Sequence, residues 1–79
     1  PDLNQDQARK RAEDIRSTIE MIPVSIPGEK DPISITVSIG VACYPTHAED
    51  VNELINAADT ALYDVKNAGR NQIRVYKKN

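Results

Sequence analysis

A chain of 79 residues is long enough for one small domain at most, and its ten basic and twelve acidic residues leave a net charge of −2. A domain of this size buries only about 60–65% of the surface that its unfolded chain exposes. With no Trp, no Phe and three Tyr, the core has to be built from smaller apolar residues. The charge balance does not suggest a nucleic-acid or membrane-surface binder, and no run of about 18 apolar residues exists. We therefore expect a soluble, cytoplasmic domain in which any affinity for phosphate is local.

The first twenty residues carry the pattern of a helix. Pro1 rather than Met opens the sequence, directly before a helix-start pattern, and this favours a piece of a longer protein. Asn4 and Gln7 form a capping pair that predicts a helix start near Gln5, and Pro23 ends the helix because its ring cannot continue the hydrogen-bond ladder. An apolar stripe that we expect to dock on a sheet comprises Ala8, Ala12, Ile15, Ile19 and Ile22. The charged residues that face elsewhere are expected to be solvated: Arg9, Lys10, Glu13, Asp14, Arg16 and Glu20.

The middle of the chain predicts a turn followed by one long strand. Pro27 and Gly28 are the pair that a type II turn requires. Larger apolar residues alternate with mostly small ones over residues 33–44, which predicts a strand, and Gly40 within it indicates a bulge or a close approach of backbone. Cys43 is expected to be a buried, reduced thiol rather than a nucleophile. His47 has no metal-ligating residue at suitable spacing, so we expect an ordinary loop residue.

The second predicted helix is the element around which the chain is organised. Asp50 and Glu53 form a capping box at its start, and Gly69 suits the left-handed position after its last turn. Its apolar stripe comprises Val51, Leu54, Ile55, Ala58, Leu62 and Val65. A separate polar stripe about 60° wide, if helical geometry continues past Gly69, comprises Asp59, Tyr63, Lys66 and Arg70. Residues 72–77 alternate as a short edge strand. From periodicity alone, Lys66 and Arg70 are most simply a solvated basic pair that the helix dipole favours.

Three stretches of the chain resemble, in order and spacing, the C-terminal half of GGDEF domains, the diguanylate cyclases. They are Ala-Glu-Asp-Ile-Arg at residues 12–16, Ile-Thr-Val-Ser-Ile-Gly-Val-Ala at residues 35–42 and Ala-Asp-Thr-Ala-Leu-Tyr-Asp-Val-Lys-Asn-Ala-Gly-Arg-Asn at residues 58–71. The third is the most diagnostic. The resemblance implies that residues 1–79 are the C-terminal part of a single GGDEF domain. The implied fold is α+β, a partial palm-like (ferredoxin-like) nucleotidyl cyclase domain of helix, strand, helix and strand with a mostly antiparallel sheet.

In the family that the chain resembles, a homodimer condenses two GTP molecules to cyclic di-GMP with release of pyrophosphate, assisted by Mg²⁺ or Mn²⁺. The signature hairpin and the metal carboxylates have no counterpart here, because the sequence contains no Gly-Gly pair and would start after that hairpin. The resemblance thus implies no catalytic and no metal-ligating residue in this chain. It implies that Lys66 and Arg70 contact the terminal phosphates of GTP, through a compact ammonium and a planar fork of donors.

Two other positions carry weaker implications. Asp59 and Tyr63 match family positions of a supporting kind, and Asp59 is a candidate for orienting a backbone or basic group near the phosphates. Asp14 stands where some family members have an arginine of an inhibitory cyclic di-GMP site, so the resemblance does not extend to product inhibition through that arginine.

Three functions stay open from the sequence. In the first, the parent protein is an active diguanylate cyclase, which other domains can anchor to a membrane, and this chain alone is inactive. Alternatively, it is a degenerate GGDEF domain that binds GTP or a protein partner without catalysis. A third function is that of a structural module whose strands pair with copies of itself.

Overall fold

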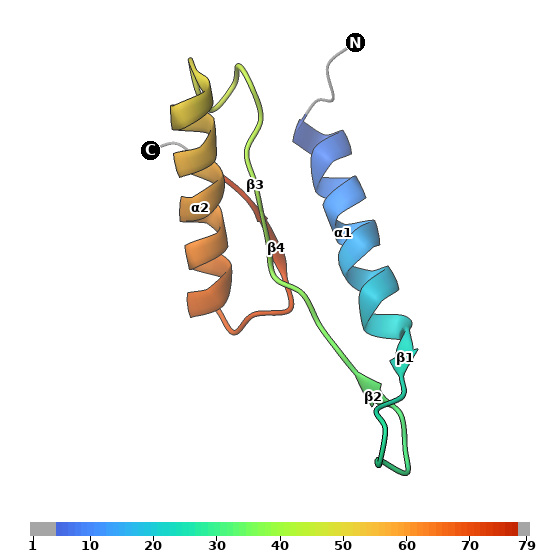
Figure 1. Ribbon diagram of the computed structural model, residues 1–79. Coiled ribbons are helices and arrows are strands. Elements are labelled where there is room, and N and C mark those ends of the chain that lie inside the picture. The colour runs from blue at the N-terminus through green and yellow to red at the C-terminus, as the bar shows by residue number, and fades with distance from the viewer. Residues whose placement is uncertain (1–4, 78–79) are drawn as a thin grey trace.

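The computed structural model describes residues 5–77, which form two helices and four short strands (Figure 1). α1 (Gln5–Met21) leads into β1 (Pro23–Val24), which pairs antiparallel with β2 (Ile33–Ser34). β3 (Ile39–Val41), α2 (Val51–Asn67) and β4 (Ile73–Val75) follow, and β4 lies parallel to β3. β3 and β4 lie between the two helices, whereas the β1–β2 hairpin projects away from them. The molecule is therefore elongated, with extents of 50 × 28 × 19 Å.

The mixture of helices and strands agrees with the α+β prediction, but the strand pairing differs from a mostly antiparallel sheet. β3 and β4 are joined through α2, and such a helical crossover brings the chain back in the same direction, so the pair is parallel. Within residues 5–77, β1 and β2 form the one antiparallel pair. The predicted strand over residues 33–44 is divided, because β2 pairs with β1 and β3 with β4. Residues 35–38 cross between the two sheets without a ladder partner in the described chain.

The helix boundaries follow the local signals in the sequence. α1 is helical from Gln5, the first described residue, and ends at Met21, before Pro23 as predicted; the capping residue Asn4 lies outside the described residues. At the start of α2, the N–H of Glu53 donates to Oδ1 of Asp50 at 2.8 Å, which confirms the predicted cap. Neither helix, within the part of the chain that the structure describes, is long and apolar enough to cross a membrane.

The tip of the β1–β2 hairpin is the type II turn that the sequence predicts. Gly28 has a φ of 91°, a left-handed value that other residues rarely adopt. The N–H of Glu29 donates to the carbonyl of Ile26 at 3.0 Å, which closes the four-residue turn.

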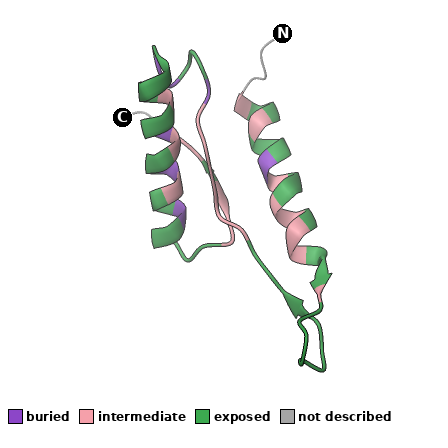
Figure 2. Cartoon of the chain, viewed as in Figure 1, coloured by how far each residue is buried: buried purple, intermediate pink, exposed green. Residues whose placement is uncertain are grey.

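The core is small and is centred where α2 crosses β3, as the buried face of α2 in Figure 2 shows. Its buried apolar residues are Ala12, Cys43, Ala48, Ala57, Ala61 and Val65. α2 lies so close to β3 that a Cβ at Gly40 would overlap the backbone of Ala58 and Leu62, which confirms the predicted close approach. Cys43 is a buried free thiol, in agreement with its predicted burial.

Some large apolar residues that were predicted to pack on the sheet are instead exposed. Val51 and Ile55 of α2 are 69% and 54% exposed, and Ile15 of α1 is 49% exposed. The buried line on α2 follows small residues and then Val65, because the close crossing at Gly40 leaves no room for larger side chains. Nothing in the described chain covers the flank of α2 that carries Val51 and Ile55.

Candidate functional site

α2 ends in a Schellman motif that fixes where the chain leaves the helix. The N–H of Arg70 donates to the carbonyl of Val65 at 3.0 Å, and the N–H of Gly69 donates to the carbonyl of Lys66 at 3.4 Å. Gly69 has a φ of 112°, so it occupies the left-handed position that the sequence predicts for it. The backbone of Arg70 is thereby tied to the last turn of the helix that carries Lys66.

The predicted polar stripe on α2 is shorter than the sequence suggested. α2 ends at Asn67, and because the backbone turns left-handed at Gly69, helical geometry does not extend to Arg70. Three of the predicted residues remain on one face of α2, and all three are exposed: Asp59, Tyr63 and Lys66. Within residues 5–77, Asp59 makes no hydrogen bond or ion pair, so its supporting role stays a prediction.

The two residues after Gly69 also have left-handed backbone. Arg70 has a φ of 66° and Asn71 a φ of 51°. For residues with a Cβ this conformation costs about 1–2 kcal/mol each, although Asn tolerates it better than most. Such a conformation persists only where the surrounding contacts hold it.

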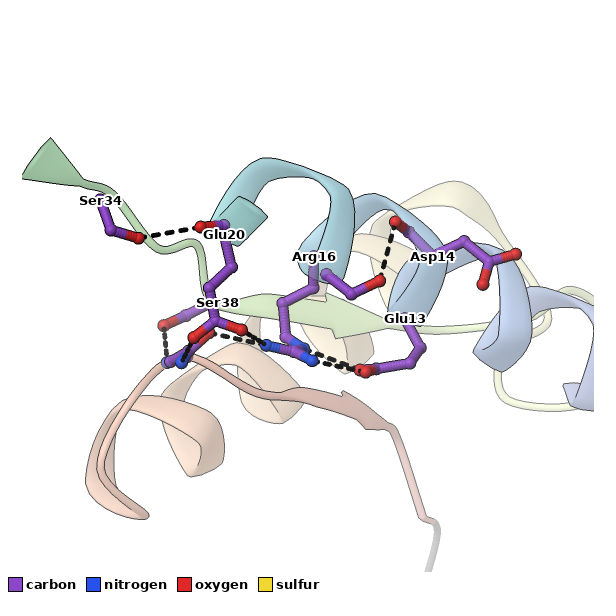
Figure 3. A network of polar contacts seen from close by, with 8 residues as sticks. Glu13, Asp14, Arg16, Glu20, Ser34 and Ser38 are labelled. Atoms are coloured by element: carbon purple, nitrogen blue, oxygen red, sulfur yellow. Dashed lines mark hydrogen bonds and ion pairs between the residues drawn. The ribbon is translucent and has the colours of Figure 1, made fainter. Parts of the chain in front are cut away.

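Those contacts come from Asn71, whose amide is bonded at both ends. Nη1 of Arg16 donates to Oδ1 of Asn71 at 2.9 Å, and Nδ2 of Asn71 donates to Oε2 of Glu20 at 2.7 Å. The backbone N–H of Asn71 donates to Oγ of Ser38 at 3.2 Å. The turn after α2 is therefore fastened to α1 and to the segment before β3, as the contacts in Figure 3 show. We refer to Arg16, Glu20 and Asn71 as the turn clamp.

Arg16 corrects the prediction that the charged face of α1 is solvated. Its side chain is only 15% exposed, with Nε donating to Glu13 at 2.8 Å and Nη1 to Glu20 at 3.1 Å. The hydrogen bond from Asn71, followed by that from Arg16, lowers the pKa of Glu20 below its ordinary value of 4.5. The hydrogen bond from Arg16 likewise lowers the pKa of Glu13. The spacings of three and four residues signal ion pairs within α1, but the contact with Asn71, 55 residues away, has no local signal.

Acidification should release the turn clamp. Because the pKa of Glu20 is lowered in the folded state, its carboxylate contributes stability above its ordinary pKa of 4.5, and this contribution is lost as the pH falls through the folded-state pKa. In the complete domain, we expect Glu20→Gln to be less stable than wild type near neutral pH, and this difference in stability to narrow as the pH falls below 4.5. Urea unfolding at a series of pH values measures the difference in unfolding free energy between wild type and Glu20→Gln. Glu29→Gln, at the exposed hairpin tip, is the control, and a Glu20→Gln gap that is constant with pH would contradict the expectation.

Two exposed basic residues lie at the C-terminal end of α2, Lys66 in its last turn and Arg70 in the turn that follows. Within the described chain, neither side chain makes a hydrogen bond or an ion pair, and both are exposed to solvent. The carbonyls at a helix C-terminus carry partial negative charge, so the backbone here does not attract an anion. The ammonium and the guanidinium have to supply that attraction themselves, and two cations at the same end of a helix are suited to an extended anion.

His47 has a structural role that the sequence did not suggest. It is only 8% exposed, and its Nδ1 accepts a hydrogen bond from the N–H of Cys43 at 3.0 Å. Its ring lies edge-on to Tyr76, with 5.6 Å between centroids. Among residues 5–77, no three His, Cys, Asp or Glu side chains gather in a way that could hold a metal ion.

Comparison of the sequence with known proteins points to one family. Residues 1–72 match the family model described as diguanylate cyclase, GGDEF domain. The chain is 38% identical over 73 residues to the uncharacterized protein YhcK of Bacillus subtilis, across 92% of this chain and 20% of that protein. It is 35% identical over 74 residues to the probable diguanylate cyclase DgcT of Escherichia coli, across 94% of this chain and 16% of that protein. Diguanylate cyclase A of Treponema denticola is 38% identical over 68 residues, across 86% of this chain and 18% of that protein.

These matches confirm the resemblance drawn from residues 12–16, 35–42 and 58–71. They also set its extent, because the chain spans no more than 20% of the length of these curated relatives.

Proposed function

Since this chain belongs to the diguanylate cyclase GGDEF domain family, we propose that the protein containing it condenses two GTP molecules to cyclic di-GMP. In this reaction each 3′-oxygen forms a bond to the α-phosphorus of the other GTP, and each α-phosphorus loses its bond to the β-phosphate oxygen. Two pyrophosphates leave, and two hydroxyl protons pass to solvent. We assign the phosphate-binding part of the site to this chain.

The observation that carries the proposal is the pair of unpaired basic side chains at the end of α2. Lys66 and Arg70 are exposed and free of ion pairs within residues 5–77, so they are available to a triphosphate. Negative charge builds up on the departing pyrophosphate, and cations beside the terminal phosphates stabilise it. Each charge-assisted contact of this kind contributes about 1.5–3 kcal/mol.

The metal ion and the partner subunit belong to the same proposal. Among residues 5–77 no group of three or more His, Cys, Asp or Glu side chains could hold a metal ion, so the Mg²⁺ or Mn²⁺ of the proposed reaction has its ligands outside these residues. One GTP on each domain of a homodimer accounts for a product with twofold symmetry. We place the reaction in the cytoplasm, where GTP is available.

An assay of the complete protein tests this function. Incubated with GTP and Mg²⁺, the protein that contains this chain is expected to form cyclic di-GMP and pyrophosphate. The isolated 79-residue chain is expected to form neither, since phosphate contacts without metal carboxylates do not assemble the reaction. A folded, dimeric complete protein that binds GTP without turnover would replace the proposal with that of a degenerate GGDEF domain.

Exposed apolar residues favour assembly as a second candidate function. Large apolar side chains are exposed from the end of α1 through the β1–β2 hairpin to the adjoining segment that has no ladder partner, namely Met21, Ile22, Ile26, Ile33 and Ile35. Unpaired strand backbone beside apolar side chains promotes pairing between copies of a chain. We therefore propose that the isolated chain self-associates. A stable monomer in sedimentation velocity would contradict this.

A further inference from the structure

Asn71 lies in a surface turn, yet both ends of its side-chain amide and its backbone N–H make hydrogen bonds. Its amide oxygen accepts from Arg16, its amide nitrogen donates to Glu20, and its backbone N–H donates to Ser38. Arg can only donate and a carboxylate can only accept, so these partners fix the orientation of the amide. A flipped amide would lose both side-chain bonds.

The turn that this clamp holds also carries Arg70. Arg70 and Asn71 are adjacent residues with φ values of 66° and 51°. The backbone N–H of Arg70 is bonded to Val65, while its side chain is exposed. The backbone sets the direction of the Cα–Cβ bond from which the Arg70 side chain extends, and the clamp holds that backbone on its C-terminal side. A phosphate contact depends on that direction, because the guanidinium donates through a rigid planar fork.

We propose that Arg16 and Glu20 are positioning residues for GTP, which act by clamping Asn71 and thereby aiming Arg70 at the phosphates. The inference rests on the proposed function, because it needs Arg70 to contact GTP. The inference gives α1 a role in GTP binding, which it exerts through the turn that carries Arg70 and Asn71. Because the contact between Asn71 and Glu20 joins a hydrogen-bond donor to an acceptor, the amide and the carboxylate can be exchanged between the two positions.

An exchange of amide and carboxylate provides the matched variants. Asn71→Asp removes the donor to Glu20 and sets two carboxylates against each other, which breaks the clamp. Asn71→Asp combined with Glu20→Gln restores a donor and an acceptor in reversed order and keeps the net charge of wild type. Arg9→Ala breaks an exposed ion pair with Asp6 elsewhere on α1 and is the control.

The experiment is a double-variant cycle in the complete domain, with 3′-deoxy-GTP as the probe, because it lacks the attacking hydroxyl and is not consumed. Asn71→Asp is expected to weaken binding about tenfold, and the exchanged pair to recover it to within about threefold. In an Arg70→Ala background, Asn71→Asp is expected to change binding less than about twofold, because the group that it aims is already gone. Thermal unfolding of each variant, measured alongside, accounts for any effect on the fold.

The outcomes separate this inference from the proposed function. If Arg70→Ala alone leaves binding unchanged, the proposed phosphate contact is wrong. If Arg70→Ala weakens binding but Asn71→Asp has the same effect with and without Arg70, the clamp acts on the fold alone and the inference is overturned. Should Asn71→Asp not fold, Glu20→Gln takes its place in the same cycle, with the same two criteria.

Discussion

Arg70→Ala in the complete domain is expected to lower kcat/KM for GTP by about 10- to 150-fold, which corresponds to a loss of about 1.5–3 kcal/mol. The side chain is exposed and has no ion pair within the described chain, so its removal uncovers no buried charge and leaves stability almost unchanged. Lys66→Ala is expected to act in the same direction. Arg70→Lys should recover only part of the loss, because an ammonium cannot reproduce two parallel donors. Steady-state kinetics with GTP and Mg²⁺ measures these effects.

Lys30→Ala is the control for this series. It removes the same charge from the β1–β2 loop, which projects away from α2 (Figure 1). If Lys30→Ala lowers kcat/KM as much as Arg70→Ala does, the effect is one of net charge. If Lys66 and Arg70 serve only the helix C-terminus, their removal would lower stability by a few tenths of a kcal/mol and leave kcat/KM unchanged.

Gly40→Ala is expected to destabilise the complete domain by about 3 kcal/mol, at the upper end of what over-packing costs. The added Cβ would overlap the backbone of Ala58 and Leu62, and neither backbone can move aside by a change of rotamer. α2 would have to lift away from β3, which would open the core around Ala61 and Val65. The free energy of unfolding, from urea titration, measures this loss.

Gly28→Ala is the control that separates the cost of steric overlap at Gly40 from the cost of an unfavourable backbone conformation. Gly28 has a left-handed φ of 91°, but a Cβ there would meet no atom within 4 Å. This variant should therefore cost only about 1 kcal/mol. An equal or larger loss for Gly28→Ala than for Gly40→Ala would show that the crossing of α2 over β3 does not limit stability.

Features that depend on neighbouring residues could be predicted from the sequence. The cap formed by Asp50, the type II turn at Gly28 and the left-handed Gly69 each rest on contacts within a few residues. The composition of such a short segment decides its backbone, because no distant partner is needed. The same holds for the end of α1 before Pro23.

Features that depend on distant partners could not be predicted from the sequence. The parallel pairing of β3 with β4 is decided by the path through α2, and the division of the predicted strand follows from which segments lie alongside it. The turn clamp joins Arg16 to Asn71 across 55 residues. In the candidate site, the family motif pointed to Lys66 and Arg70, but helical periodicity misplaced Arg70 because the helix ends in a Schellman motif.

The most direct test of the account is to compare the affinities of the complete domain and its Arg70→Ala variant for GTP and for GMP, by equilibrium titration. GMP keeps the guanine and the α-phosphate but lacks the terminal phosphates that Lys66 and Arg70 are proposed to contact. Arg70→Ala is expected to weaken GTP binding by about tenfold or more and to change GMP binding by less than about twofold. Unchanged GTP affinity, or an equal loss for both nucleotides, would contradict this expectation.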